Sequence, residues 1–131
     1  LVRFVDETTL VYQACDDETD AHYEELAELA RALSALTTAD GGTYRRVALP
    51  LPAPQYDPED GHRLPAGYAN FLIANGCILM PAFADPADDI AAARLADCFP
   101  DRRLIRIDSR ALIRQHGGLH CAAMQIPALP I

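Results

Sequence analysis

A strand, an acidic turn, a helix and an arginine-flanked strand occur twice in this sequence, in the same order. The first copy runs from TLVYQACDDETD through a helix to RRVALP, and the second from CILMPAFADPAD through a helix to RRLIRI. A repeat of this size is typical of modules arranged around an axis or stacked in a row, because one module cannot bury its own hydrophobic face. The repeat therefore predicts an α/β fold of small mixed sheets, each covered by a helix, in which two units do not complete the assembly.

The first unit is expected to contain two strands separated by a helix. Residues 8–15 are rich in β-branched and aromatic side chains and predict a strand. Apolar periodicity predicts a helix that begins at an Asp20 cap and ends near Leu36, followed by a strand over 45–51. The proline-rich stretch 50–67 then predicts a long loop, which is either a functional loop or an ordinary surface connection.

The second unit opens with a predicted hairpin. The dipeptide Asn75-Gly76 lies between two apolar runs and favours a type I′ turn, in which both central residues have positive φ. The helix that follows is expected to begin at Asp85-Pro86, an N-cap residue followed by proline. The remaining pattern predicts strands over 68–74, 77–83, 102–108 and 119–126, and a helical turn over 109–114.

Composition excludes several function classes. The net charge is −8, and all 11 basic residues are arginines, which argues against binding to a nucleic-acid backbone. No apolar stretch is long enough to span a membrane, and no signal peptide is visible at the start. A cytoplasmic protein that does not bind membranes is expected, and its acidic surface is compatible with a cationic small ligand.

The four cysteines are widely spaced, form no CxxC pair and are expected to be reduced thiols. Cys121 stands out because it follows the pair Gly117-Gly118 in the stretch QHGGLHCAAMQ. Three interpretations stay open: a small buried core residue, a nucleophile at a strand end, or a zinc ligand with His116 and His120, although this spacing matches no standard zinc motif. On a strand, His120 and Cys121 would point to opposite faces, so His120 is not expected to serve as the base for Cys121.

Three segments resemble one protein family. HGGLHCAAMQIPA resembles the terminal GGGxHCxTxQxP element of agmatine deiminases and bacterial peptidyl-arginine deiminases, which are guanidine-modifying enzymes of the pentein superfamily. GYANFLIANGCILMPAFADPAD is similar to the family's YxNFxxANGxVxxPxF-DPxD segment, and RFVDETTLVYQACDD to the strand after its His-x-Asp-Glu motif. The resemblance covers essentially the whole chain in the expected order. Two positions depart from it, since Gln115-His116 replaces glycines and Ala123 replaces the commoner threonine.

The resemblance implies a pentein-type α/β propeller, of whose five ββαβ modules this chain holds about two. Residues 1–131 would be the C-terminal part of a single catalytic deiminase domain, with approximate modules 1–67 and 68–131. Cys121 would be the catalytic nucleophile, and substrate binding would involve Gly117, Gly118, His120 and Asn70. The general acid/base histidine and the carboxylates that hold the guanidinium would belong to the His-x-Asp-Glu motif, which this chain lacks.

The implied reaction converts agmatine to N-carbamoylputrescine and ammonia, a step toward putrescine and the polyamines, through a covalent cysteine thiouronium intermediate. It needs no metal or organic cofactor. The expected partners are a small cationic guanidine and the remaining modules of the parent protein, and self-association of the chain is left open. The alternatives are deimination of arginine or peptidyl arginine, and a non-catalytic fragment or interaction module.

Overall fold

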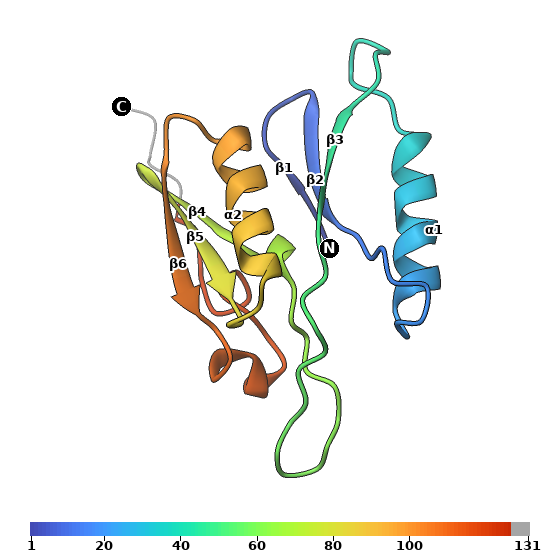
Figure 1. Ribbon diagram of the computed structural model, residues 1–131. Helices are drawn as coiled ribbons and strands as arrows, with labels where there is room; N and C mark the ends of the chain where they lie inside the picture. Colours follow the sequence, from blue (N-terminus) through green and yellow to red (C-terminus); the bar gives the residue numbers. More distant parts are fainter. Residues whose placement is uncertain (127–131) are drawn as a thin grey trace.

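The computed structural model describes residues 1–126 and shows two consecutive ββαβ units (Figure 1). In each unit the middle strand pairs antiparallel with the strand before it and parallel with the strand that follows the helix, which gives the strand orders β1-β2-β3 and β4-β5-β6. The predicted repeat is therefore confirmed as two small mixed sheets. The strands and helices are β1 (Val2–Phe4), β2 (Thr9–Gln13), α1 (Tyr23–Ser34), β3 (Arg45–Leu49), β4 (Leu72–Ala74), β5 (Cys77–Ala82), α2 (Ala87–Cys98) and β6 (Arg103–Asp108).

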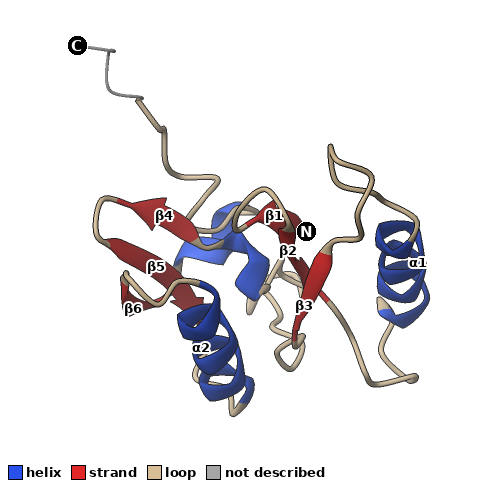
Figure 2. Ribbon diagram, turned by 90° about the horizontal axis from the view of Figure 1, so that it is seen from above, coloured by secondary structure: helices blue, strands red, loops and turns tan. Residues whose placement is uncertain are grey.

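Helix α1 begins two residues later than the sequence predicts, because His22 rather than Asp20 is its N-cap. One Asp20 carboxylate oxygen accepts the His22 backbone N–H in the turn before the helix, and both oxygens accept the Arg63 guanidinium. The acidic turn therefore fastens the proline-rich loop to the first unit. Helix α1 stands beside the first sheet (Figure 2) and buries Leu26 and Leu33.

The hairpin β4–β5 forms, but two of its predicted details are wrong. Gly76 alone of the two turn residues has positive φ, at 75°, so the turn is not type I′. The first half of the predicted strand 68–74 is instead a short 3₁₀ helix, Tyr68–Asn70, and only Leu72–Ala74 pairs with β5. The 3₁₀ segment matters because it carries Asn70.

Helix α2 begins one residue later than predicted, because Pro86 rather than Asp85 is its N-cap. The Asp85 carboxylate accepts the Ala87 N–H at 2.8 Å, and the Asp88 carboxylate accepts the Asp85 N–H at 3.3 Å, so both side chains still hold the start of the helix. Asp88 is buried and also accepts the Tyr68 hydroxyl at 2.7 Å and the Phe83 N–H at 3.0 Å. One side chain therefore joins the start of α2, the end of β5 and the 3₁₀ helix.

The predicted last strand, 119–126, is wrong. After a second 3₁₀ helix, Leu112–Gln115, the chain forms local turns, in which the Ala122 N–H donates to the Gly118 carbonyl and the Ala123 N–H to the His120 carbonyl. These bonds close the backbone on itself, so no ladder with a neighbouring strand can form there. His120 and Cys121 consequently do not occupy alternate faces of a strand.

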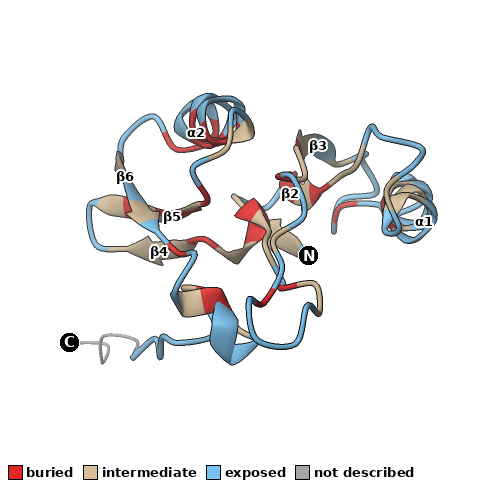
Figure 3. Ribbon diagram, turned by 60° about the horizontal axis from the view of Figure 1, so that its bottom comes forward, coloured by how far each residue is buried: buried red, intermediate tan, exposed pale blue. Residues whose placement is uncertain are grey.

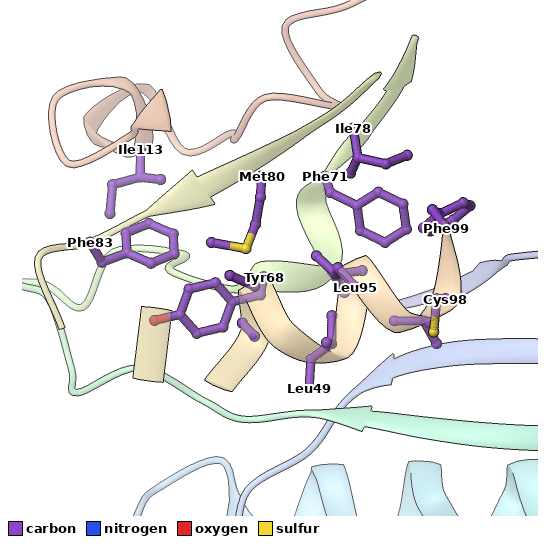
Figure 4. Packing of buried hydrophobic residues seen from close by; sticks show 14 of the residues in the cluster. Leu49, Tyr68, Phe71, Ile78, Met80, Phe83, Leu95, Cys98, Phe99 and Ile113 are labelled. Atoms are coloured by element: carbon purple, nitrogen blue, oxygen red, sulfur yellow. The ribbon is translucent and has the colours of Figure 1, made fainter. Parts of the chain in front are cut away.

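One hydrophobic core joins the two units. Val11 and Leu49 from the first sheet belong to the same cluster as the side chains of β5 and α2. Figure 4 shows Phe71, Leu95 and Phe99 gathered at one end of this cluster and Tyr68, Met80 and Phe83 at the other. Figure 3 shows that buried positions concentrate where the units meet, whereas the outer side of α1 is exposed. Within residues 1–126, neither helix combines the length and the apolar character that crossing a membrane requires.

Candidate active site

Cys121 lies in the turn after the second 3₁₀ helix and is exposed. Its sulfur lines a cleft of about 480 Å³, which refutes the interpretation of Cys121 as a buried core residue. Both units and the proline-rich loop form the walls. The lining residues are Leu1, Arg3, Gln13, His22, Glu25, Leu26, Leu51, Pro52, Ala53, Pro54, Gln55, Arg63, Leu64, Pro65, Ala66, Gly67, Ala69, Asn70, His120 and Cys121.

Asn70 contacts Cys121 and His120, the two residues that the sequence resemblance assigns to the same site. Its Nδ2 donates to Cys121 Sγ at 3.2 Å, and its Oδ1 accepts the His120 backbone N–H at 2.7 Å. The Asn70 carbonyl accepts the same N–H at 3.3 Å. The contacts join residues that are 50 and 51 positions apart in the sequence, so the 3₁₀ helix and the cysteine turn form one structure.

The two glycines allow this close approach. A Cβ atom at Gly118 would lie 2.6 Å from Asn70 Cγ, and one at Gly117 would lie 3.0 Å from Cys121 Cβ. Gly118 is buried against the Asn70 side chain, and neither glycine has positive φ. They are therefore needed for space, and the structure shows them packing against site side chains rather than lining the cleft.

The surroundings of Cys121 favour its thiolate form. The hydrogen bond from the Asn70 amide, and after it the one from the Gly118 backbone N–H, lower the pKa of Cys121 below that of an ordinary thiol. Cys98 is the opposite case, because burial in the core raises the pKa of its thiol. The prediction that Cys98 is a core residue is confirmed.

The charges in the cleft wall are partly neutralised by partners within the chain. The Arg63 guanidinium binds both carboxylate oxygens of Asp20 at 2.8 Å. Arg3 Nη1 donates to the Phe71 carbonyl at 2.8 Å, and its guanidinium lies over the Phe71 ring. Among the lining residues in the described part of the chain, Glu25 is the only carboxylate. Residues 1–126 therefore do not supply the set of acids that would surround a bound guanidinium.

His116 does not join Cys121 and His120. It adopts a left-handed backbone conformation at φ 65°, and its ring stacks on His62 with centroids 4.8 Å apart. Over residues 1–126 no group of three or more His, Cys, Asp or Glu side chains is arranged to hold a metal ion. The alternative of a zinc site formed by His116, His120 and Cys121 is therefore not supported by the geometry.

Arg3 and Gln13 are site residues that sequence reasoning missed. Both line the cleft, and Gln13 Oε1 accepts the Ala69 N–H at 3.5 Å while its Nε2 donates to the Leu49 carbonyl at 3.2 Å. Gln13 is almost completely buried in β2, so an inward-facing polar residue in an apolar strand was the available signal. The position of Arg3 gave no such signal, because its partner lies 68 residues away in the sequence.

Comparison with known proteins points to one family. The chain is 35% identical to an agmatine deiminase of Pseudomonas fluorescens (strain SBW25), with a match that covers 86% of this chain and 35% of the relative. Residues 1–131 thus span about a third of that relative's length.

Solved structures agree with this match. A crystal structure from Porphyromonas gingivalis, described as a candidate arginine deiminase, superposes with a TM-score of 0.92 at 46% identity and covers 97% of this chain and 37% of its own. The C. jejuni agmatine deiminase superposes with a TM-score of 0.82 at 37% identity and covers 93% of this chain and 35% of its own. These likenesses confirm the expected α/β fold of the pentein type. The model of the Porphyromonas-type peptidyl-arginine deiminases matches residues 1–127, and the chain therefore belongs to that family.

Proposed function

We propose that the protein containing this chain hydrolyses the guanidine group of agmatine, with Cys121 as the nucleophile. The observation that carries the proposal is an exposed sulfur at a cleft, which receives hydrogen bonds from the Asn70 amide and the Gly118 N–H. Sequence relatives and solved structures named as agmatine deiminases support the reaction class. The C. jejuni agmatine deiminase has also been solved with one cysteine replaced by serine and with substrate bound, which fits a reaction that needs a thiol.

The proposed chemistry proceeds in two steps. The Cys121 thiolate attacks the central carbon of the guanidinium and forms a C–S bond, and the tetrahedral adduct expels ammonia after one nitrogen has taken up a proton. Water then adds to the carbon of the thiouronium intermediate, the C–S bond breaks and the sulfur leaves as the thiolate again. The products are one ammonia and one ureido compound for each guanidine and water consumed.

The described residues supply only part of this machinery. A guanidinium needs carboxylates around it, and the cleft offers Glu25 alone. We infer that these acids and the general acid/base histidine come from a His-x-Asp-Glu motif elsewhere in the parent protein, of which this chain would be the C-terminal part. The chain alone is expected to be inactive, and a cytoplasmic location stays a prediction.

The proposal is tested by measuring ammonia release from agmatine by the full-length protein and its Cys121→Ala variant. We expect turnover to fall by about a thousandfold or more, because covalent catalysis is lost with the sulfur. Cys77→Ala is the matched control, since Cys77 lies in β5 away from the cleft lining and should keep its turnover. Undiminished turnover in Cys121→Ala would reject the assignment.

The family name makes peptidyl arginine the second candidate substrate. Comparison of kcat/KM for agmatine, free arginine and an arginine-containing peptide on the same full-length protein decides between them. A preference for the peptide would replace agmatine while leaving the role of Cys121 intact. If none of the three is turned over, the chain belongs to a non-catalytic module.

A further inference from the structure

We propose that Asn70 is a positioning residue, whose side-chain amide holds the Cys121 sulfur in its anionic form and aims it into the cleft. The inference rests on the proposed role of Cys121 as nucleophile. It differs from the resemblance-based prediction that Asn70 binds substrate.

The orientation of the Asn70 amide is fixed by its second partner. The His120 backbone N–H can only donate, so the atom of Asn70 that it meets at 2.7 Å must be the carbonyl oxygen Oδ1. The NH₂ group is then the one that lies 3.2 Å from Cys121 Sγ. A donor at this position stabilises a thiolate, and it does so in the protein without substrate.

The 3₁₀ helix that carries Asn70 is held on both sides. The Arg3 guanidinium binds the carbonyl of the residue after Asn70, and Gln13 Oε1 accepts the N–H of the residue before it. The Tyr68 hydroxyl donates to the buried carboxylate of Asp88, and burial, together with this hydrogen bond, raises the pKa of Tyr68 above its usual range. Residues from both ββαβ units therefore fix the backbone from which the amide projects.

The amide has little capacity left for a cationic substrate. Its NH₂ group faces the sulfur, and a donor cannot bind a guanidinium, which carries only N–H donors. Its oxygen already accepts the His120 N–H. Gly118 packs closely against Asn70, since a Cβ there would lie 2.6 Å from Cγ.

Asn70→Asp and Asn70→Ala together test whether Asn70 stabilises the Cys121 thiolate or binds the guanidinium of the substrate. Aspartate has nearly the shape of asparagine and can still accept the His120 N–H, but it places a negative oxygen where the donor was. If Asn70 holds the thiolate, the pKa of Cys121 rises by one unit or more, and the thiolate fraction at neutral pH falls about tenfold for each unit. A carboxylate this close to Sγ repels the thiolate in either case, so Asn70→Ala is the variant that decides between the roles. If Asn70 serves only to bind the guanidinium, Asn70→Ala raises KM and leaves the pKa of the free thiol unchanged.

The experiment measures the rate of iodoacetamide alkylation of Cys121 against pH, without substrate, in the full-length protein. Mass spectrometry of the peptide that follows Arg114 distinguishes Cys121 from the other thiols. Asn75→Asp is the matched control, because it adds the same charge at an exposed turn residue. Asn70→Ala, which removes the donor without adding charge, should raise the pKa by a smaller amount, and thermal unfolding curves check that all variants fold.

An upward shift in both Asn70 variants and none in Asn75→Asp supports the proposal, and kcat should then fall with KM little changed. An unchanged alkylation profile in Asn70→Ala, even with a shift in Asn70→Asp, overturns it, and so does an equal shift in Asn75→Asp. The alkylation profile is measured without substrate, so its result does not depend on catalysis. Failure of the proposed function would appear in a different measurement, as undiminished activity in Cys121→Ala.

Discussion

At the residue scale, the surroundings of a thiol decide what the thiol can do. Cys98 and Cys121 are both free cysteines, but Cys98 is packed in the core and Cys121 faces a cleft. Burial without donors favours the neutral thiol, whereas two N–H donors favour the thiolate. The space for one of these donors depends on the absence of a side chain at Gly118.

Gly118→Ala should therefore impair the site without unfolding the protein. The new methyl carbon would lie 2.6 Å from Asn70 Cγ, so Asn70 must move and weaken its contact with Cys121. Because φ at Gly118 is not positive, alanine itself is not strained there. We expect kcat/KM to fall about tenfold or more, because the Cys121 thiolate loses one hydrogen bond and a smaller fraction of the thiol is ionised. The exposed Ala122→Gly is the control, and full activity in Gly118→Ala would contradict the steric argument.

At the element scale, the proline-rich loop 50–67 is an ordered wall of the cleft. Its start and end both line the cleft, and Arg63 ties it to the acidic turn before α1 through Asp20. Further along the chain, Arg114 contacts Asp57 at 3.5 Å and Glu59 at 2.9 Å, which holds the loop to the second 3₁₀ helix. The loop is thus fixed to the two segments that flank the site.

The Asp20–Arg63 pair makes a pH-dependent contribution to stability. The Arg63 hydrogen bond lowers the pKa of Asp20 in the folded protein below its value of about 3.9 in the unfolded chain. The contribution is therefore present above about pH 4 and is lost as the pH falls through the folded pKa. Asp20→Asn should lower the free energy of unfolding by about 2 kcal/mol at pH 7, because the pair is largely buried.

Urea unfolding of the parent protein and the Asp20→Asn variant at several pH values measures this difference. The difference should shrink as the pH falls below about 4 and through the lowered folded-state pKa of Asp20, where the carboxyl of the parent protein becomes protonated as well. Asp16→Asn, at an exposed position of the same turn, is the control. A difference that does not change with pH would show that the ion pair is not its cause.

At the scale of the whole molecule, the two units depend on each other. Leu49 ends β3 in the first sheet but is fully buried in the cluster that includes Leu95 of α2. Arg3 and Gln13 of the first unit hold the 3₁₀ helix of the second. The cleft exists only where the units meet, so separating them would remove both its walls and the support of Asn70.

Leu49→Ala should accordingly destabilise the protein and the site together. A large-to-small change at a fully buried leucine costs about 3 kcal/mol, from lost burial and the cavity that remains. Leu36→Ala is the control, because Leu36 is 48% exposed and should cost less than about 1 kcal/mol. Differential scanning fluorimetry of both variants tests the expectation, and equal shifts in Tm would mean that Leu49 does not join the units.

The sequence alone determined the repeat, because local apolar periodicity predicts the strands and helices, and acidic residues such as Asp85 mark the turns before the helices. It also singled out Cys121, since a cysteine after two glycines is a local pattern. It misplaced two segments for different reasons. The carboxylate of Asp20 binds the distant Arg63, and residues in 119–126 form local turn hydrogen bonds instead of pairing as a strand. Only the tertiary structure decided that Asn70 meets Cys121, because a hydrogen bond between residues 51 positions apart leaves no trace in the pattern around either one.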